Sequence, residues 1–139
     1  MKKFLLLLIV PLFHVSCSND SESEDVTLEL LPVSEVEIPG NINAGKDNSI
    51  KVRFVRPTEC YSFNKFYFEM SSSTRTIAVE SKVAHNNGNG NCRPLTSNNI
   101  STEVLKFHPE TTGNYKLKFW KGKDTNGNDL FLTYDVTAQ

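Results

Sequence analysis

The stretch that decides the fold is residues 109–117, PETTGNYKL, which separates two segments of alternating polar and apolar side chains. The apolar residues on either side of it are Leu105, Phe107, Tyr115, Leu117 and Phe119. Such period-two alternation predicts strands with one buried face. Proline interrupts a sheet ladder and glycine permits a tight turn, so this stretch predicts a corner between two strands.

Alternation of the same kind extends outward from this corner over residues 26–139, and turn residues separate the alternating segments. No convincing helical periodicity is found there. Short alternating segments with turns between them predict an all-β antiparallel sandwich of about seven strands, and the length is usual for such a domain. The expected strands are centred on Val36–Ile38, Ile50–Phe54, Tyr61–Met70, Ile77–Val83, Leu105–Phe107, Tyr115–Phe119 and Leu130–Val136.

The segment Tyr61–Met70 is dense in aromatic side chains, which fall on both faces of the expected strand. A strand covered on both faces needs such a composition, so we predict that this one is central and that its rings lie in the core. The alternative is a surface platform on which a sugar stacks.

The corner itself resembles the E–F corner of immunoglobulin-like domains, in which a glycine turn precedes a tyrosine whose hydroxyl bonds back to the corner. Gly113 and Tyr115 match this pattern, and Leu117 stands where antibody domains have their second core cysteine. The chain departs from antibody domains because its one tryptophan, Trp120, is not in the third strand. The resemblance therefore implies an immunoglobulin-like β-sandwich for residues 26–139, and that fold does not fix a function.

The first sixteen residues are typical of an export signal. Two lysines precede the apolar run Phe4–Phe13, which is too short to span a bilayer as a helix. Ser16 and Cys17 resemble the lipobox of bacterial lipoproteins, although His14 departs from its usual aliphatic residue. The resemblance implies a signal peptide over residues 1–16 and acyl chains, palmitate among them, on Cys17. Ordinary signal-peptidase cleavage and a buried N-terminal helix are the alternatives.

The segment that follows Cys17 is acidic and contains no apolar residue. Residues 18–25, SNDSESED, hold four acids and no base, so residues 17–25 are expected to form a disordered tether behind the lipidated cysteine. An acidic stretch in this place resembles the surface-export signal of Bacteroidetes-type lipoproteins. The resemblance implies a protein anchored by lipid in the outer membrane and exposed at the cell surface.

Two cysteines remain beyond the expected lipidation site. Cys60 and Cys92 are 32 positions apart, and an even pair in an exported protein predicts a disulfide. Free thiols and a metal site are the alternatives. The metal site is disfavoured because neither cysteine has a second ligand at zinc-site spacing.

Charge and composition exclude several function classes. From Val26 onward the chain has 13 basic and 12 acidic residues, well interspersed, so we expect no nucleic-acid partner. His85 and His108 belong to no catalytic set, and a copper site is disfavoured because no Cys, His or Met follows Tyr115. We expect no cofactor and no enzymatic activity.

One loop contains oxygen side chains spaced like part of a calcium site. Asp124, Asn126, Asn128 and Asp129 are the candidate ligands, but no glutamate follows at the place of the bidentate ligand. Asn126-Gly127 is also a strong hairpin-turn dipeptide. We predict a turn here, with adventitious calcium binding as the alternative.

The sequence thus predicts a lipid-anchored envelope protein with a non-enzymatic binding or structural sandwich. A protein or a glycan is the expected kind of partner, besides the membrane that the anchor enters. The alternative is an envelope protease inhibitor or a small exported enzyme. The long loop around Gly88 and Arg93 is faintly similar to the loops of chagasin-type inhibitors. The order and spacing of its motifs do not match those of the inhibitors.

Overall fold

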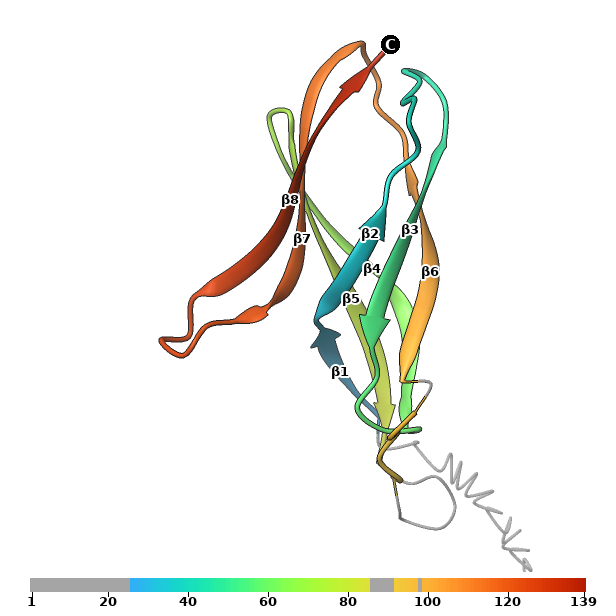
Figure 1. The fold of residues 1–139 in the computed structure, drawn as a ribbon, viewed down its shortest axis with the longest axis vertical. Helices are drawn as coiled ribbons and strands as arrows, with labels where there is room; N and C mark the ends of the chain where they lie inside the picture. The colour runs from blue at the N-terminus through green and yellow to red at the C-terminus, as the bar shows by residue number, and fades with distance from the viewer. Residues whose placement is uncertain (1–25, 86–91, 98) are drawn as a thin grey trace, which may run out of the picture.

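The computed structural model describes residues 26–85, 92–97 and 99–139, and within them the protein is all-β. The expected signal peptide, Cys17 and tether lie outside these residues. The described residues form eight strands, which make two sheets packed as a sandwich (Figure 1). The strands are β1 (Val26–Leu31), β2 (Val33–Glu37), β3 (Asn48–Val55), β4 (Tyr61–Ser71), β5 (Thr74–Ala84), β6 (Ile100–Phe107), β7 (Gly113–Lys123) and β8 (Asp129–Ala138).

The smaller sheet has the order β2-β3-β6 and is antiparallel throughout. The larger sheet is built around β5. One edge of β5 pairs with β4, and the other edge pairs first with β7 and then with β1. The β5–β7 pair is parallel, and β8 completes this sheet beside β7. The predicted all-β sandwich is therefore confirmed.

The strand order bears on the immunoglobulin-like comparison. The order β2-β3-β6 and the β7–β8 pair correspond to strands A-B-E and F-G of immunoglobulin sandwiches. The chain departs from that plan at the third strand, because β4 pairs with β5 alone and it is β5 that lies beside β7, in a parallel pair.

The core lies between the sheets and is made by alternate residues of β3, β5, β6 and β7. Each of these strands places a run of apolar side chains on its inner face, and burying them supplies the main favourable term in folding. The largest fully buried side chains are Phe54, Phe107, Phe119, Ile50, Ile77, Leu117, Val52 and Val79.

An additional strand, β1, precedes the seven that were predicted. Its outer positions hold apolar residues, Leu28 and Leu30, which are exposed, while Leu31 is buried. Because apolar residues occupy the exposed positions of β1, its sequence does not show the alternation that indicates a half-buried strand. At Pro32 the chain leaves β1 in the larger sheet and enters β2 in the smaller one. Proline suits this position because it cannot donate to a ladder.

The prediction that Tyr61–Met70 is a central strand is wrong. β4 pairs with β5 alone and so forms an edge of the larger sheet. Phe63 and Phe66 pack against the core from this edge, whereas Tyr67 and Met70 are exposed. The aromatic residues of β4 are therefore divided between the surface that faces the core and the surface that faces solvent.

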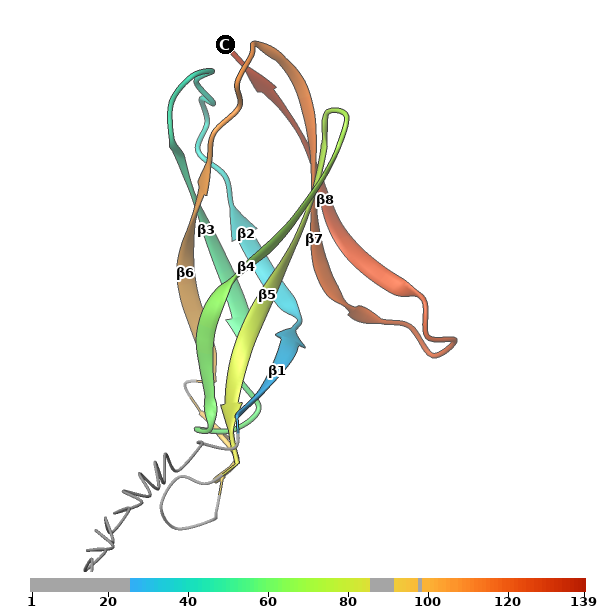
Figure 2. The same cartoon turned by 180° about the vertical axis from the view of Figure 1, so that it is seen from behind.

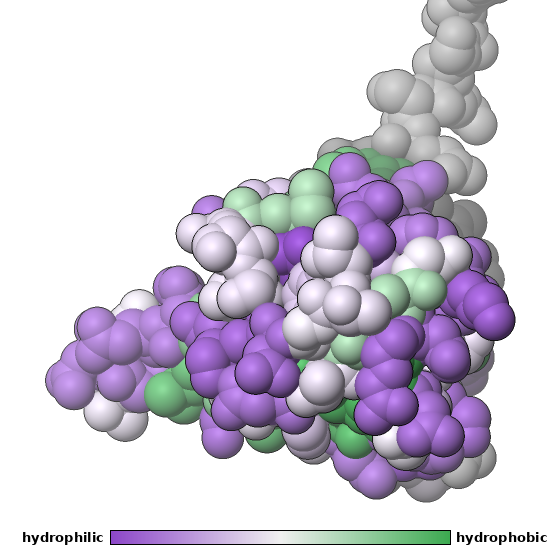
Figure 3. Space-filling model, turned by 90° about the horizontal axis from the view of Figure 1, so that it is seen from above, coloured by the Kyte–Doolittle hydropathy of each residue, from purple (hydrophilic) through white to green (hydrophobic). Residues whose placement is uncertain are grey.

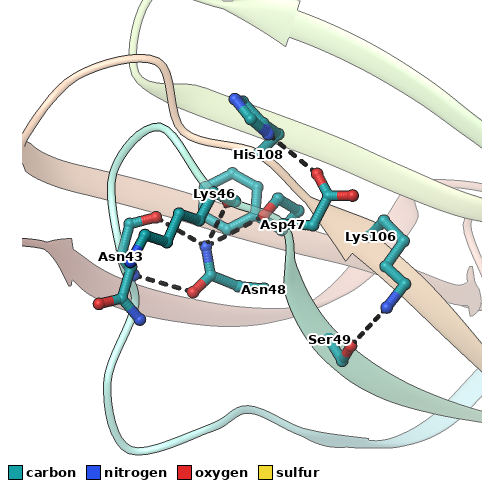
Figure 4. A network of polar contacts seen from close by, with 8 residues as sticks. Asn43, Lys46, Asp47, Asn48, Ser49, Lys106 and His108 are labelled. Atoms are coloured by element: carbon teal, nitrogen blue, oxygen red, sulfur yellow. Dashed lines mark hydrogen bonds and ion pairs between the residues drawn. The ribbon is translucent and has the colours of Figure 1, made fainter.

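A buried asparagine holds the turn between β2 and β3. Asn48 is 5 % exposed, and its Oδ1 accepts a hydrogen bond of 2.8 Å from the backbone N–H of Asn43 (Figure 4). Its Nδ2 donates to the carbonyl oxygens of Asn43, Lys46 and Phe107 at 2.9, 2.9 and 3.2 Å. This side chain therefore ties the turn to β6.

The end of the molecule seen from above is mostly hydrophilic, with small hydrophobic patches (Figure 3).

Candidate functional site

A row of side chains crosses the outer face of the larger sheet. Tyr67 on β4 is opposite Ala78 on β5, and Trp120 on β7 is opposite Phe131 on β8. The two halves of the row adjoin because Ile77 and Phe119, the preceding residues of β5 and β7, are themselves paired.

These four side chains face away from the core. Ile77 and Phe119 are fully buried between the sheets, and successive side chains of a strand point to opposite faces. Ala78 is only 4 % exposed although it lies on the outer face, so larger neighbours cover its methyl group.

A hollow of about 290 Å³ lies over this row. The small side chain of Ala78 makes room between the rings of Tyr67 and Trp120. We call the hollow the outer groove. It is lined mainly by carbon atoms, from Leu30, Tyr67, Glu69, Thr76, Ala78, Trp120, Lys123, Asp129 and Phe131.

The groove forms where β7 leaves β5. Their pairing ends at Ile77 and Phe119, after which β7 has a register irregularity between Trp120 and Gly122. Gly122 has a φ of 111°, in the region that favours glycine. The β7–β8 hairpin then projects away from the other strands (Figures 1 and 2). β1 takes over the edge of β5 from Val79 onward, which brings Leu30 to the groove.

The tryptophan ring is held in place by a carboxylate. The indole N–H of Trp120 donates a hydrogen bond of 2.8 Å to Oδ1 of Asp129. Nζ of Lys123 lies 2.7 Å from the same oxygen. The hydrogen bonds from Lys123 and then from Trp120 lower the pKa of Asp129, which therefore stays ionised at neutral pH. A ring fixed in this way loses little freedom when a ligand contacts it.

The other residues that line the groove differ in whether a neighbouring side chain already contacts them. Nζ of Lys118 lies 4.2 Å from the centre of the Phe131 ring, so one face of that ring already contacts a cation. Tyr67 is 49 % exposed and Leu30 is 44 % exposed. Within the described part of the chain, Glu69 forms no ion pair. Tyr67, Leu30 and Glu69 thus remain accessible to a ligand.

A larger depression, of about 580 Å³, lies between residues 38–42 and the edge of β8. Its lining is more polar than that of the outer groove, and Tyr134 is the aromatic residue in it. Tyr134 packs against the core through Phe119, at 6.1 Å between ring centres. This depression therefore offers a ligand no exposed ring comparable to Tyr67.

The predicted disulfide is present. Cys60 and Cys92 are bonded, with their Cα atoms 5.4 Å apart. The bond joins the start of β4 to the chain beyond β5, close to Ala84, whose N–H donates to the carbonyl oxygen of Cys60 at 3.2 Å. It therefore closes the open end of the β4–β5 hairpin and lies away from the lining of the outer groove.

The corner residues lie where the spacing put them. Gly113 has a φ of 136°, and Tyr115 is 7 % exposed with its hydroxyl near Thr111. Tyr115 shares the inner face of β7 with Leu117 and Phe119, both buried. Tyr115 is thus part of the core, Gly113 supplies the exposed turn before it, and neither residue lines the outer groove.

The four candidate calcium ligands are divided between two sets of partners. Oδ1 of Asp124 accepts hydrogen bonds of 2.8 Å from the backbone N–H groups of Asn126 and Asn128, and its Oδ2 accepts one of 2.9 Å from Nδ2 of Asn128. Asp129 instead bonds to Trp120 and Lys123. The first three residues therefore form the hairpin turn between β7 and β8, and Asp129 belongs to the groove.

The two remaining histidines have separate partners. Nε2 of His85 lies 2.8 Å from Oγ1 of Thr27, and Nδ1 of His108 lies 2.9 Å from Oδ1 of Asp47. In the described ranges, no three His, Cys, Asp or Glu side chains are grouped so that they could hold a metal ion. Nor do these ranges contain a helix long and apolar enough to cross a membrane.

The sequence pointed to only part of the groove. Tyr67 lay in the stretch weighed as a sugar platform, and Trp120 was conspicuous as the one tryptophan. Leu30, Ala78 and Phe131 were missed, because only the pairing of β5 with β1 and β7 brings them beside these rings.

Comparisons with known proteins add no family to this description. No model of a known protein family matches the sequence, no curated protein matches it, and no solved structure matches its fold.

Proposed function

We propose that this protein is a lipid-anchored envelope protein of the outer membrane that binds a ligand, without transforming it, in the outer groove. The export signal, Ser16-Cys17 and the acidic stretch behind them support the anchor. The observation that carries the binding function is the outer groove itself. The ring of Tyr67 is exposed and those of Trp120 and Phe131 are half-buried, and rings that remain accessible around a hollow are characteristic of binding surfaces.

The absence of enzymatic activity is part of the proposal. The polar groups of the groove are two carboxylates, one ammonium and the hydroxyls of Thr76 and Tyr67. Asp129 is engaged by Trp120 and Lys123, so its carboxylate serves to position the indole ring. A catalytic site pairs a nucleophile or base with a partner that activates it. The residues that line the groove form no such pair, and they provide instead the surface that a ligand contacts.

Metabolic labelling with a fatty acid tests the anchor. The wild-type protein is expected to take up label and to fractionate with membranes, and Cys17→Ala is expected to lose both properties. A Cys17→Ala protein that keeps its label and its membrane association would overturn this half of the proposal.

Fluorescence of Trp120 tests the groove, because it is the one tryptophan of the chain. The protein, purified in detergent micelles, is mixed in turn with the polysaccharide, protein and lipid fractions of cell envelopes. One fraction is expected to shift the emission saturably and to shield Trp120 from acrylamide, and Tyr67→Ala is expected to weaken the effect.

The matched control is Ile100→Ala, which truncates an exposed apolar side chain on the other sheet and should respond like the wild type. If no fraction shifts the emission, or if Tyr67→Ala responds in full, the groove is not the binding surface.

A further inference from the structure

We infer that the ligand of the outer groove is a neutral carbohydrate, whose sugar ring lies against Tyr67 and Trp120 while its hydroxyls bond to the polar rim. This inference rests on the proposed binding function and names the chemical class of the ligand.

The walls favour a ligand that is apolar on its face and polar at its edge. Ala78 and the rings of Tyr67 and Trp120 present carbon, and both rings also carry a polar atom. Such amphipathic rings suit a partner of which one part is apolar and the other is hydrated. A pyranose has this form, because its C–H groups lie on the ring faces and its hydroxyls at the edge.

The rim supplies partners for hydroxyl groups in particular. The carboxylates of Glu69 and Asp129 only accept hydrogen bonds, the ammonium of Lys123 only donates, and the hydroxyl of Thr76 does both. A sugar hydroxyl can both donate and accept, so it can satisfy each of these groups. A purely apolar ligand would instead cover charged groups without replacing their hydrogen bonds to water, which is costly.

The charges argue for a neutral ligand. An acidic sugar would bring its carboxylate beside those of Glu69 and Asp129, and like charges placed together at an interface are unfavourable. Lys123 offsets the charge of Asp129, with which it is paired at 2.7 Å, so the carboxylate of Glu69 leaves the lining with a net charge of −1.

The side chains that would contact such a ligand are already held in position without it. Trp120 is oriented by its hydrogen bond to Asp129, and Tyr67 and Ala78 are held by consecutive backbone pairs of β4 and β5. The volume of about 290 Å³ is at the small end for ligand sites, and the groove is open to solvent. We therefore expect weak binding of one or two sugar rings, to which a surface crowded with anchored copies would add avidity.

The test titrates the purified protein with four probes and follows Trp120 emission and calorimetric heat. The probes are cellopentaose and xylopentaose, which are neutral, pentagalacturonate, which is anionic, and an uncharged peptide rich in phenylalanine. At least one neutral pentasaccharide is expected to bind saturably, and pentagalacturonate is expected to bind more weakly than that probe.

Groove variants show where the sugar lies. Tyr67→Ala is expected to weaken binding about tenfold, the loss of one stacked ring, whereas Tyr67→Phe keeps the ring and most of the affinity. Glu69→Gln is expected to weaken the neutral probe and to improve pentagalacturonate. Ile100→Ala is the control, and thermal unfolding of each variant confirms that it is folded.

Two results would overturn the inference. One is that neither neutral pentasaccharide binds, and the other is that Tyr67→Ala binds as well as the wild type. If the peptide or pentagalacturonate alone binds in the groove, the carbohydrate assignment fails and the proposed binding function stands. If none of the four probes binds and no envelope fraction shifts Trp120 emission, both fail.

Discussion

The hydroxyl of Tyr115 donates a hydrogen bond of 2.9 Å to the carbonyl oxygen of Thr111, four residues earlier in the chain. The ring packs edge-on against Phe107 at 5.5 Å, and the guanidinium of Arg75 lies 5.3 Å from its centre. One side chain thus fastens the turn between β6 and β7 to strands of both sheets.

Tyr115→Phe is expected to lower the free energy of unfolding by about 1 kcal/mol, because it removes the hydrogen bond and keeps the ring. Urea unfolding followed by circular dichroism measures the change. Tyr67→Phe, which removes an exposed hydroxyl, is the control and should have little effect on stability. An unchanged urea midpoint for Tyr115→Phe would show that the corner bond does not stabilise the fold.

Removal of the disulfide is expected to cost about 3.5 kcal/mol, since the bond restricts the unfolded chain over a sequence separation of 32 residues. The double variant Cys60→Ser, Cys92→Ser should therefore unfold at a clearly lower urea concentration. Intact wild-type protein without reductant is the reference, and alkylation of two thiols in that reference would contradict the assignment.

Asn48→Ala is expected to destabilise the protein by about 1–3 kcal/mol, because it leaves a buried carbonyl group of Phe107 and part-buried backbone groups of Asn43 and Lys46 without their partner. Asn41→Ala, at an exposed position before the same turn, serves as the matched control. Calorimetric melting of both variants measures the difference. Equal melting temperatures would mean that water replaces the amide.

The turn between β7 and β8 is expected to loosen only in strong acid. Hydrogen bonds from the side chain and backbone of Asn128, and then from Asn126 and Gly127, lower the pKa of Asp124 below its ordinary value of 3.8. A group whose pKa is lower in the folded state stabilises the fold above its ordinary pKa, and the effect disappears as the pH falls through the lowered value.

Amide exchange of Asn126 and Asn128, measured by NMR during an acid titration, reports this change. Protection should persist through pH 4 and fall below it, and Asp124→Asn should show no such step. A step at or above the ordinary pKa would contradict the lowered value.

The sequence predicted those features that depend on local pattern. Tyr115, Leu117 and Phe119 were placed on one buried face because simple alternation determines it. The edge position of β4 was not predicted, because its aromatic residues divide between the core and the outer groove, and that division looks like burial on both faces.

The groove could be predicted only in part, since it depends on which strands become neighbours. Nothing near Ala78 indicates that β7 lies parallel beside its strand and ends that pairing one residue earlier. Long-range partners of this kind are chosen by the packing of the whole sandwich, which local periodicity does not encode.

The change of sheet at Pro32 determines how the domain bears a pulling force. β1 is held to β5 by six consecutive antiparallel pairs, and it continues directly into β2 of the other sheet. Strands β1 and β5 lie side by side (Figure 1), and Tyr67 is paired with Ala78 of β5, next to the far end of β1. Tension that enters at Val26, with Tyr67 held by a ligand, therefore acts along β1 and β5. The six pairs must then slip together, whereas a load across the strands would open them one at a time. A domain tethered through its N-terminal side would thus resist unfolding when flow pulls it against a bound ligand.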